Sequence, residues 1–211
     1  MIISLIGFMG CGKSSVGRRL SELLCCPFMD LDAVIEQQTG RSIPEIFATD
    51  GEAAFRQMEL EVLESVLKQS LPSQAMGQLA TKAHRAICDP LTYLCGQRGS
   101  TVLEHSLKPS TAIVSLGGGT VTQERCAEMV REETVCIYLR ASVGTLVARL
   151  SDEAAGRPLL QGDDLHTRIE TLMKQRSHIY ESTAHHIIDT DSFSIDEVAQ
   201  SILHTLHYSI I

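Results

Sequence analysis

Residues 7–14 decide the fold, and they have the sequence Gly7-Phe8-Met9-Gly10-Cys11-Gly12-Lys13-Ser14. This stretch matches G-x-x-x-x-G-K-[ST], the pattern of a loop that binds nucleotide phosphates. Its glycines let backbone N–H groups surround a phosphate without a Cβ in the way. Lys13 adds a positive charge toward the β- and γ-phosphates, and the Ser14 hydroxyl is suited to Mg²⁺. An apolar run at 2–6 precedes the loop and an amphipathic stretch follows it, which favours a nucleotide-binding loop over a chance glycine-rich turn.

Short apolar runs alternate with longer amphipathic stretches along the chain, as is typical of a parallel α/β sheet. The apolar runs predict strands at 2–6, 27–31, 112–116, 135–139 and 187–189. Helices are expected after Lys13, at 33–39, after the capping box Ser42-Ile43-Pro44-Glu45, and at 52–67, 123–132, 143–150, about 166–184 and 195–207. We therefore expect an α/β protein, a three-layer sandwich around a five-stranded parallel sheet.

Composition excludes several classes of protein. The chain has 211 residues, of which 44% are hydrophobic and 21% charged, with a net charge of −8. That charge argues against a general surface for nucleic acid or anionic membranes, and no apolar run reaches the roughly 18 residues that a membrane span needs. The seven cysteines are odd in number and irregularly spaced, and the first residues lack the pattern of a signal peptide. We expect reduced thiols and a cytoplasmic location.

Charged residues outside the loop suggest a site for the molecule that accepts the phosphate. Asp30 and Asp32 close the second predicted strand, where alternation would send both to the same side. One carboxylate could act on the metal through water and the other could take a proton from an acceptor hydroxyl; helix capping is the alternative. Arg56, Arg157 and Arg176 are suited to bind a carboxylate or phosphate, although each alone is more often a solvated surface residue.

The order of these motifs along the chain resembles that of the shikimate kinase family. The resemblance covers about 1–68 and 112–211. The motifs that carry it are Gly7-x-x-Gly10-x-Gly12-Lys13-Ser14, Asp30-x-Asp32, Gly40-Arg41-Ser42-Ile43, Ile46-Phe47, Gly51-Glu52, Phe55-Arg56, Glu59, Ser115-Leu116-Gly117-Gly118-Gly119, Arg157-Pro158-Leu159-Leu160 and Arg176-x-x-x-Tyr180. The resemblance implies one kinase domain over residues 1–211 with a P-loop NTPase fold of the nucleoside-monophosphate-kinase type. It also implies transfer of the γ-phosphoryl group of ATP to the 3-hydroxyl of shikimate in aromatic amino-acid biosynthesis.

The resemblance also implies roles for individual residues. Asp32 would bind shikimate hydroxyls and act as the base, and Lys13 and Arg157 would balance charge on the transferred group. Mg²⁺ would be held by Ser14 directly and by Asp30 through water. The nucleotide would contact Gly10, Cys11, Gly12, Lys13, Ser14, Ser15 and, at the adenine, Arg149. The shikimate site would comprise Asp32, Arg56, Gly118, Gly119 and Arg176, with the two arginines on its carboxylate.

Two segments and two other functions remain open. We expect a mobile lid at about 152–165, which contains Arg157. Residues 69–111 have no counterpart in the family pattern, and this insertion is either an ornament or small helical subdomain, or a regulatory or oligomer contact. Cys11 is expected to be a compact loop residue, with a redox switch as the alternative.

The alternative functions are a gluconate-type kinase and a nucleotide-binding module without activity. We expect a monomer with ATP and shikimate as its partners.

Overall fold

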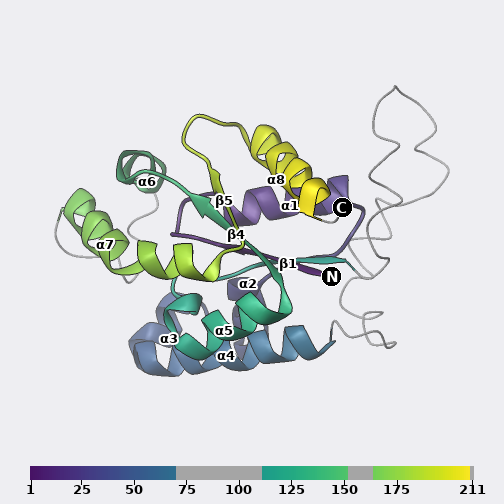
Figure 1. Ribbon diagram of the computed structural model, residues 1–211. Helices are drawn as coiled ribbons and strands as arrows, with labels where there is room; N and C mark the ends of the chain where they lie inside the picture. Colours follow the sequence, from purple (N-terminus) through teal and green to yellow (C-terminus); the bar gives the residue numbers. More distant parts are fainter. Residues whose placement is uncertain (70–110, 152–163, 210–211) are drawn as a thin grey trace.

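The computed structural model describes residues 1–69, 111–151 and 164–209, and Figure 1 shows their arrangement. The strands in these ranges are β1 (Ile2–Ile6), β2 (Phe28–Asp30), β3 (Ala112–Ser115), β4 (Val135–Arg140) and β5 (His186–Asp189). The helices are α1 (Lys13–Leu23), α2 (Leu31–Thr39), α3 (Ile43–Thr49), α4 (Gly51–Gln69), α5 (Glu124–Glu133), α6 (Val143–Leu150), α7 (Leu165–Thr183) and α8 (Ile195–Ser209), with a 3₁₀ turn, η2 (Thr120–Thr122). Each predicted strand and helix is present, with its ends shifted by a residue or two.

The strands form one parallel sheet in the order β2-β3-β1-β4-β5, which confirms the predicted five-stranded sheet. β1 lies at the centre, where Leu5 pairs with Ser115 of β3 and Ile6 pairs with Tyr138 of β4. Because all strands run the same way, their carboxyl ends meet at one edge of the sheet. That edge is where ligands bind in open α/β folds.

Helices cover both faces of the sheet, as expected for a three-layer sandwich (Figure 1). On one face α1 packs against α8, and on the other α4 and α5 lie together with α2 and α3 beside them. The inner strands are mostly apolar because both of their faces are covered; every residue of β1 and β3 is buried, Ser4 and Ser115 included. The edge strand β5 alternates between exposed and half-buried residues.

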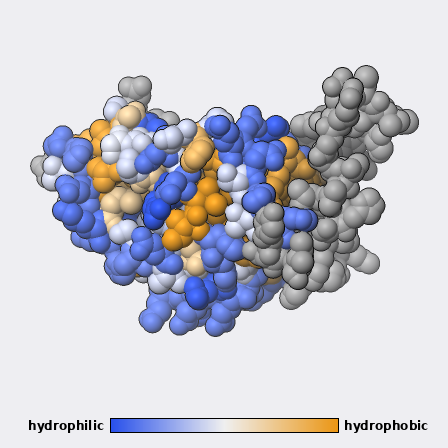
Figure 2. Space-filling model, turned by 45° about the horizontal axis from the view of Figure 1, so that its top comes forward, coloured by the Kyte–Doolittle hydropathy of each residue, from blue (hydrophilic) through white to orange (hydrophobic). Residues whose placement is uncertain are grey.

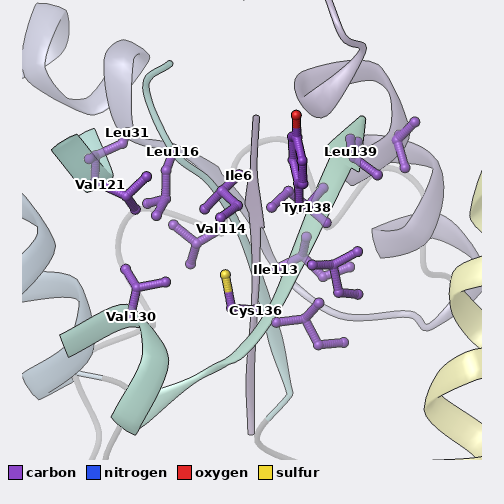
Figure 3. Packing of buried hydrophobic residues seen from close by; sticks show 14 of the residues in the cluster. Ile6, Leu31, Ile113, Val114, Leu116, Val121, Val130, Cys136, Tyr138 and Leu139 are labelled. Carbon is purple, nitrogen blue, oxygen red and sulfur yellow. The ribbon is translucent and has the colours of Figure 1, made fainter. Parts of the chain in front are cut away.

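The core fills the space between helices and sheet. Figure 3 shows Val130 of α5 on the same side of the sheet as Val114 and Cys136, and all three side chains are buried. The surface in Figure 2 is mainly hydrophilic, with small hydrophobic patches. In the part of the chain that the structure describes, no helix has the length and apolar character needed to cross a membrane.

One detail of the prediction is wrong. The second strand was expected to run to Leu31 and to place Asp32 on the strand, but β2 ends at Asp30 and Asp32 lies in the first turn of α2. The cause is a helix cap, because the Asp30 side chain accepts a hydrogen bond from the Asp32 backbone N–H at 3.2 Å and so begins the helix early. Helix geometry, and not strand alternation, therefore orients Asp32.

The capping box predicted at Ser42 is present. The Ser42 hydroxyl accepts from the backbone N–H of Glu45, and the Glu45 carboxylate accepts from the Ser42 N–H at 2.7 Å, so the start of α3 is satisfied from both sides. Most of the insertion predicted at 69–111 and of the lid predicted at 152–165, Arg157 included, lies outside the described residues.

Candidate active site

The phosphate-binding loop joins β1 to α1 at the carboxyl edge of the sheet. Its conformation favours glycine at three positions, because Gly7 has a φ of 139°, Gly10 a φ of 79° and Gly12 a φ of 99°. A Cβ on Gly7 would lie 2.5 Å from the Leu139 carbonyl oxygen, and one on Gly10 would lie 2.8 Å from the Leu150 side chain. The loop leads directly into α1, so the positive end of the helix dipole and its unpaired N–H groups face the loop.

Lys13 is buried beneath this loop. Its Nζ donates to the carbonyl oxygens of Gly7 and Phe8, at 2.9 Å each, and lies 3.8 Å from the Cys11 sulfur. The ammonium group therefore sits in the loop that the sequence assigns to nucleotide phosphates. Cys11 is 1% exposed, which agrees with its predicted role as a compact loop residue, while Ser15 is exposed in the first turn of α1.

Ser14 and Asp30 bring two oxygen atoms together beside the loop. The Ser14 hydroxyl donates to Asp30 Oδ2 at 2.5 Å, which links the start of α1 to the end of β2. A hydroxyl and a carboxylate are hard oxygen donors of the kind that Mg²⁺ prefers, and Mg²⁺ sites typically use few protein ligands together with phosphates and water. The pair therefore fits the magnesium site predicted from the sequence.

Asp32 is the carboxylate with the most perturbed chemistry. Its Oδ1 is buried and has no hydrogen-bond partner among the described residues. Burial, and next the charges of Glu59 and Asp30, raise the pKa of Asp32 from its usual 3.8 to about 6, against the opposing effect of Lys13 and Arg56. An oxygen without a partner and a pKa close to neutrality suit a group that accepts a proton.

Arg56 lies early in α4, close enough to Asp32 for its charge to lower the pKa of that carboxyl. Its guanidinium pairs with Glu59 at 2.5 Å and with Glu52 at 2.9 Å. Glu59 is completely buried, and its other oxygen accepts from the Thr120 hydroxyl at 2.5 Å. Arg56 is thus held in place by a carboxylate that is itself fixed from η2.

The triple glycine after β3 lies between these charged groups. A Cβ on Gly117 would lie 2.5 Å from Glu59 Oε1 and 2.8 Å from Asp32 Oδ1, and a Cβ on Gly119 would collide with the Arg56 guanidinium. A Cβ on Gly118 would lie 3.1 Å from the Met9 backbone nitrogen in the phosphate loop. The glycine segment 117–119, which has no side chains, therefore lies between the phosphate loop and the charged groups of Asp32, Glu59 and Arg56.

Arg176 reaches the same glycines from α7. It is 7% exposed, and its Nη1 donates to the Gly118 carbonyl oxygen at 3.3 Å. Two arginines from different helices, Arg56 of α4 and Arg176 of α7, thus lie against the Gly118–Gly119 peptide. This is the arrangement expected for a site that binds an anionic group.

Arg149, predicted to lie at the adenine, links the loop to the end of β5. From α6 its guanidinium donates to the Gly10 carbonyl at 3.4 Å and to the Thr190 carbonyl at 2.9 Å. The structure therefore places Arg149 next to the phosphate loop.

Sequence reasoning assigned no role to two residues of the site. Glu59 was recognised only as part of a motif, although its position three residues after Arg56 on a helix is a usable signal for an ion pair. Thr120 gave no signal, because a threonine after three glycines has no distinctive chemistry.

A P-loop that lies beside a glycine segment, a buried carboxylate and two arginines is typical of a small-molecule kinase with the P-loop NTPase fold. The profile of the family described as "Shikimate kinase" matches residues 9–77 and 97–207. The chain belongs to this family. The match omits residues 78–96, which lie inside the segment 69–111 that has no counterpart in the motif pattern.

Relatives and solved structures agree with this assignment. The shikimate kinase of Mycobacterium avium is 35% identical over 202 residues, covering 96% of this chain and 91% of that protein. That of Pelotomaculum thermopropionicum is 32% identical over 204 residues, covering 97% and 94%. The structure of the Acinetobacter baumannii shikimate kinase in complex with shikimate matches with a TM-score of 0.76 at 28% identity, covering 99% of this chain and 93% of that chain. The Aquifex aeolicus enzyme matches with a TM-score of 0.68 at 26% identity, covering 99% and 98%.

Proposed function

We propose that this chain transfers the γ-phosphoryl group of ATP to the 3-hydroxyl of shikimate. The single observation that carries the proposal is the closeness of the two half-sites: Gly118, beside Arg176, lies so near the phosphate loop that a Cβ on it would be 3.1 Å from the Met9 backbone nitrogen. A phosphate bound by the loop and an acid bound by the arginines would be neighbours across this glycine segment. Positioning of this kind supplies much of the catalysis in phosphoryl transfer.

On the nucleotide side, the backbone N–H groups of residues 10–15 and the Lys13 ammonium bind the phosphates. To reach a phosphate, Lys13 gives up its hydrogen bonds to the Gly7 and Phe8 carbonyls. Ser14 directly, and Asp30 through water, would hold Mg²⁺, which when bound neutralises charge on the β- and γ-phosphates. Arg149 contacts the adenine; its hydrogen bond to the Gly10 carbonyl, which places it beside the phosphate loop, supports this role.

On the acceptor side, Arg56 and Arg176 bind the shikimate carboxylate, and Asp32 binds ring hydroxyls. Asp32 takes the proton of the attacking hydroxyl, for which a pKa of about 6 leaves it ionised yet basic at neutral pH. The glycines Gly118 and Gly119 let the ring approach the backbone closely. Arg157 of the predicted lid completes the site by balancing charge on the transferred group.

An ADP-release assay with separate acceptors tests the proposal. We expect ADP formation that depends on shikimate and is much slower with gluconate or with no acceptor. Release that depends on gluconate would assign the chain to the alternative kinase class. ATP binding without release under any of these conditions would indicate a module that has lost activity.

We also propose that the enzyme acts as a monomeric single domain in the cytoplasm. Both described half-sites are built from one chain, and the sheet combines strands from both ends of the sequence, which supports one kinase domain over residues 1–211. Five described cysteines are free, Cys11, Cys25, Cys26, Cys126 and Cys136, which supports a reducing compartment. Size-exclusion chromatography with light scattering measures the oligomeric state.

A further inference from the structure

The Gly118 carbonyl oxygen accepts two hydrogen bonds from α7. One comes from Arg176 Nη1 at 3.3 Å, and the other from the Tyr180 hydroxyl, one helical turn later. A carbonyl oxygen has two lone pairs, so both are used and the direction of the C=O bond is fixed from two sides. Tyr180 takes no part in the functional assignments above.

The position of this carbonyl determines the position of the glycine segment. The Gly118–Gly119 peptide is trans and planar, so the Gly119 N–H points opposite to the Gly118 C=O. Glycine has no side chain to restrain its backbone, and a peptide between two glycines rotates more freely than any other. Without an external restraint, this segment would sample several orientations between Arg56 and Arg176.

Tyr180 is well suited to restrain the segment. Its side chain is completely buried, and its ring packs on that of Tyr138 with centroids 5.2 Å apart. Burial raises the pKa of the Tyr180 hydroxyl, so the group stays protonated and remains a donor. The buried ring therefore holds the Tyr180 hydroxyl in place, and the hydroxyl in turn restrains the Gly118–Gly119 backbone.

We propose that Tyr180 is a positioning residue for the acceptor: its hydroxyl fixes the Gly118–Gly119 peptide between the two arginines that bind the acceptor carboxylate. This inference rests on the proposed function for the identity of the acceptor. The restraint itself exists in the ligand-free protein. It acts on the acceptor half-site more than on the nucleotide half-site, because the Tyr180 hydroxyl donates to Gly118, which belongs to the acceptor half-site.

The test replaces Tyr180 by phenylalanine, which keeps the buried ring and removes only the hydroxyl. We expect the KM for shikimate to rise about three- to tenfold, the effect of one hydrogen bond, while the KM for ATP changes less than about twofold. Tyr138→Phe is the matched control, since it removes the hydroxyl of the other ring in the stacked pair, and it should leave the KM for shikimate unchanged. Equal changes in both KM values, or no change, would overturn the proposal.

A second measurement separates this inference from the proposed function. In the protein without ligands, hydrogen exchange of the Gly119 amide, followed by NMR, should be faster in Tyr180→Phe than in Tyr138→Phe or the unmodified chain. If the unmodified chain fails to phosphorylate shikimate, the proposed function fails, but faster Gly119 exchange still supports the restraint. Unchanged Gly119 exchange contradicts it.

The unmodified protein provides a third test should Tyr180→Phe not fold. A buried hydroxyl that donates to a carbonyl exchanges slowly with water, so its proton should give an NMR signal connected to the Tyr180 ring. A protected signal supports the proposal. A Tyr180 hydroxyl proton that exchanges at the rate of an exposed tyrosine refutes it.

Discussion

Replacing Asp32 by asparagine is expected to abolish phosphoryl transfer and at the same time to stabilise the ligand-free protein at neutral pH. The fold keeps the Asp32 carboxyl in surroundings that disfavour its charge, with Oδ1 buried and unpartnered and with Glu59 and Asp30 nearby. The pKa of Asp32 is therefore raised from 3.8 to about 6. Because one pKa unit corresponds to about 1.4 kcal/mol, ionised Asp32 destabilises the fold by at most about 3 kcal/mol.

The sign of the pH dependence follows from proton binding. The folded state retains the Asp32 proton up to about pH 6, whereas the unfolded chain releases it near pH 3.8. Unfolding in this interval releases a proton, so the unmodified protein loses this part of its stability as the pH rises. The gain from asparagine should be near zero below about pH 4 and complete above about pH 7.

Differential scanning calorimetry at two pH values measures this effect. The asparagine amide also needs hydrogen-bond partners, so we expect a net gain of about 1–2 kcal/mol at neutral pH, or about 2–8 °C in Tm for a chain of this size. Asp30→Ala is the control with the opposite sign, because it removes the side chain that caps α2 and accepts from Ser14; it should lose about 1 kcal/mol. Nucleotide binding should survive Asp32→Asn. An equal change in Tm at both pH values, or a lower Tm at neutral pH, would refute the reasoning.

Three further predictions concern the acceptor site. The kcat/KM for shikimate should fall about tenfold per pH unit below pH 6 as Asp32 is protonated, with half of the maximum near the pKa of about 6; a pH profile that is flat down to pH 5 would exclude Asp32 as the base. Glu59→Gln should raise the KM for shikimate at least about tenfold, because it removes a buried partner of Arg56, and should shift the acid limb of that profile to lower pH; an acid limb that does not move would contradict the coupling. Gly119→Ala should abolish shikimate binding, measured by calorimetry, because its Cβ meets the Arg56 guanidinium, whereas Gly144→Ala, where a Cβ meets nothing within 4 Å, should bind normally; normal binding by both variants would show that Arg56 can move aside.

Local sequence patterns predicted the strands and the phosphate loop, because the residues that determine each of them are neighbours in the sequence. The loop needs glycines with positive φ followed by Lys13 and Ser14, and β1 and β3 need predominantly apolar runs because both of their faces are covered. The prediction for Asp32 failed at one residue. Strand alternation and helix capping compete for the same short segment, and the Asp30 cap prevailed.

The second layer of the site could not be derived from local patterns. Glu59 is charged and lies on a helix, which usually indicates a solvated face, yet it is fully buried. Its burial depends on Thr120, a partner 61 residues away in the sequence. Long-range contacts of this kind follow from how α4 and η2 pack, and that packing leaves no periodic signal in either segment.

The position of β1 has a consequence for how the chain folds during synthesis. β1, the central strand of the sheet, precedes both of its neighbours, β3 and β4, in the chain, so Ile2 stays unpaired until Ala112 has been synthesised. At a synthesis rate of roughly 5–20 residues per second, this delay lasts about 5–20 seconds. Throughout that time the nascent chain carries a mostly apolar strand with unpaired edges, a kind of segment that is prone to aggregate. The central strand thus makes the yield of folded enzyme sensitive to the rate at which residues 70–110 are translated.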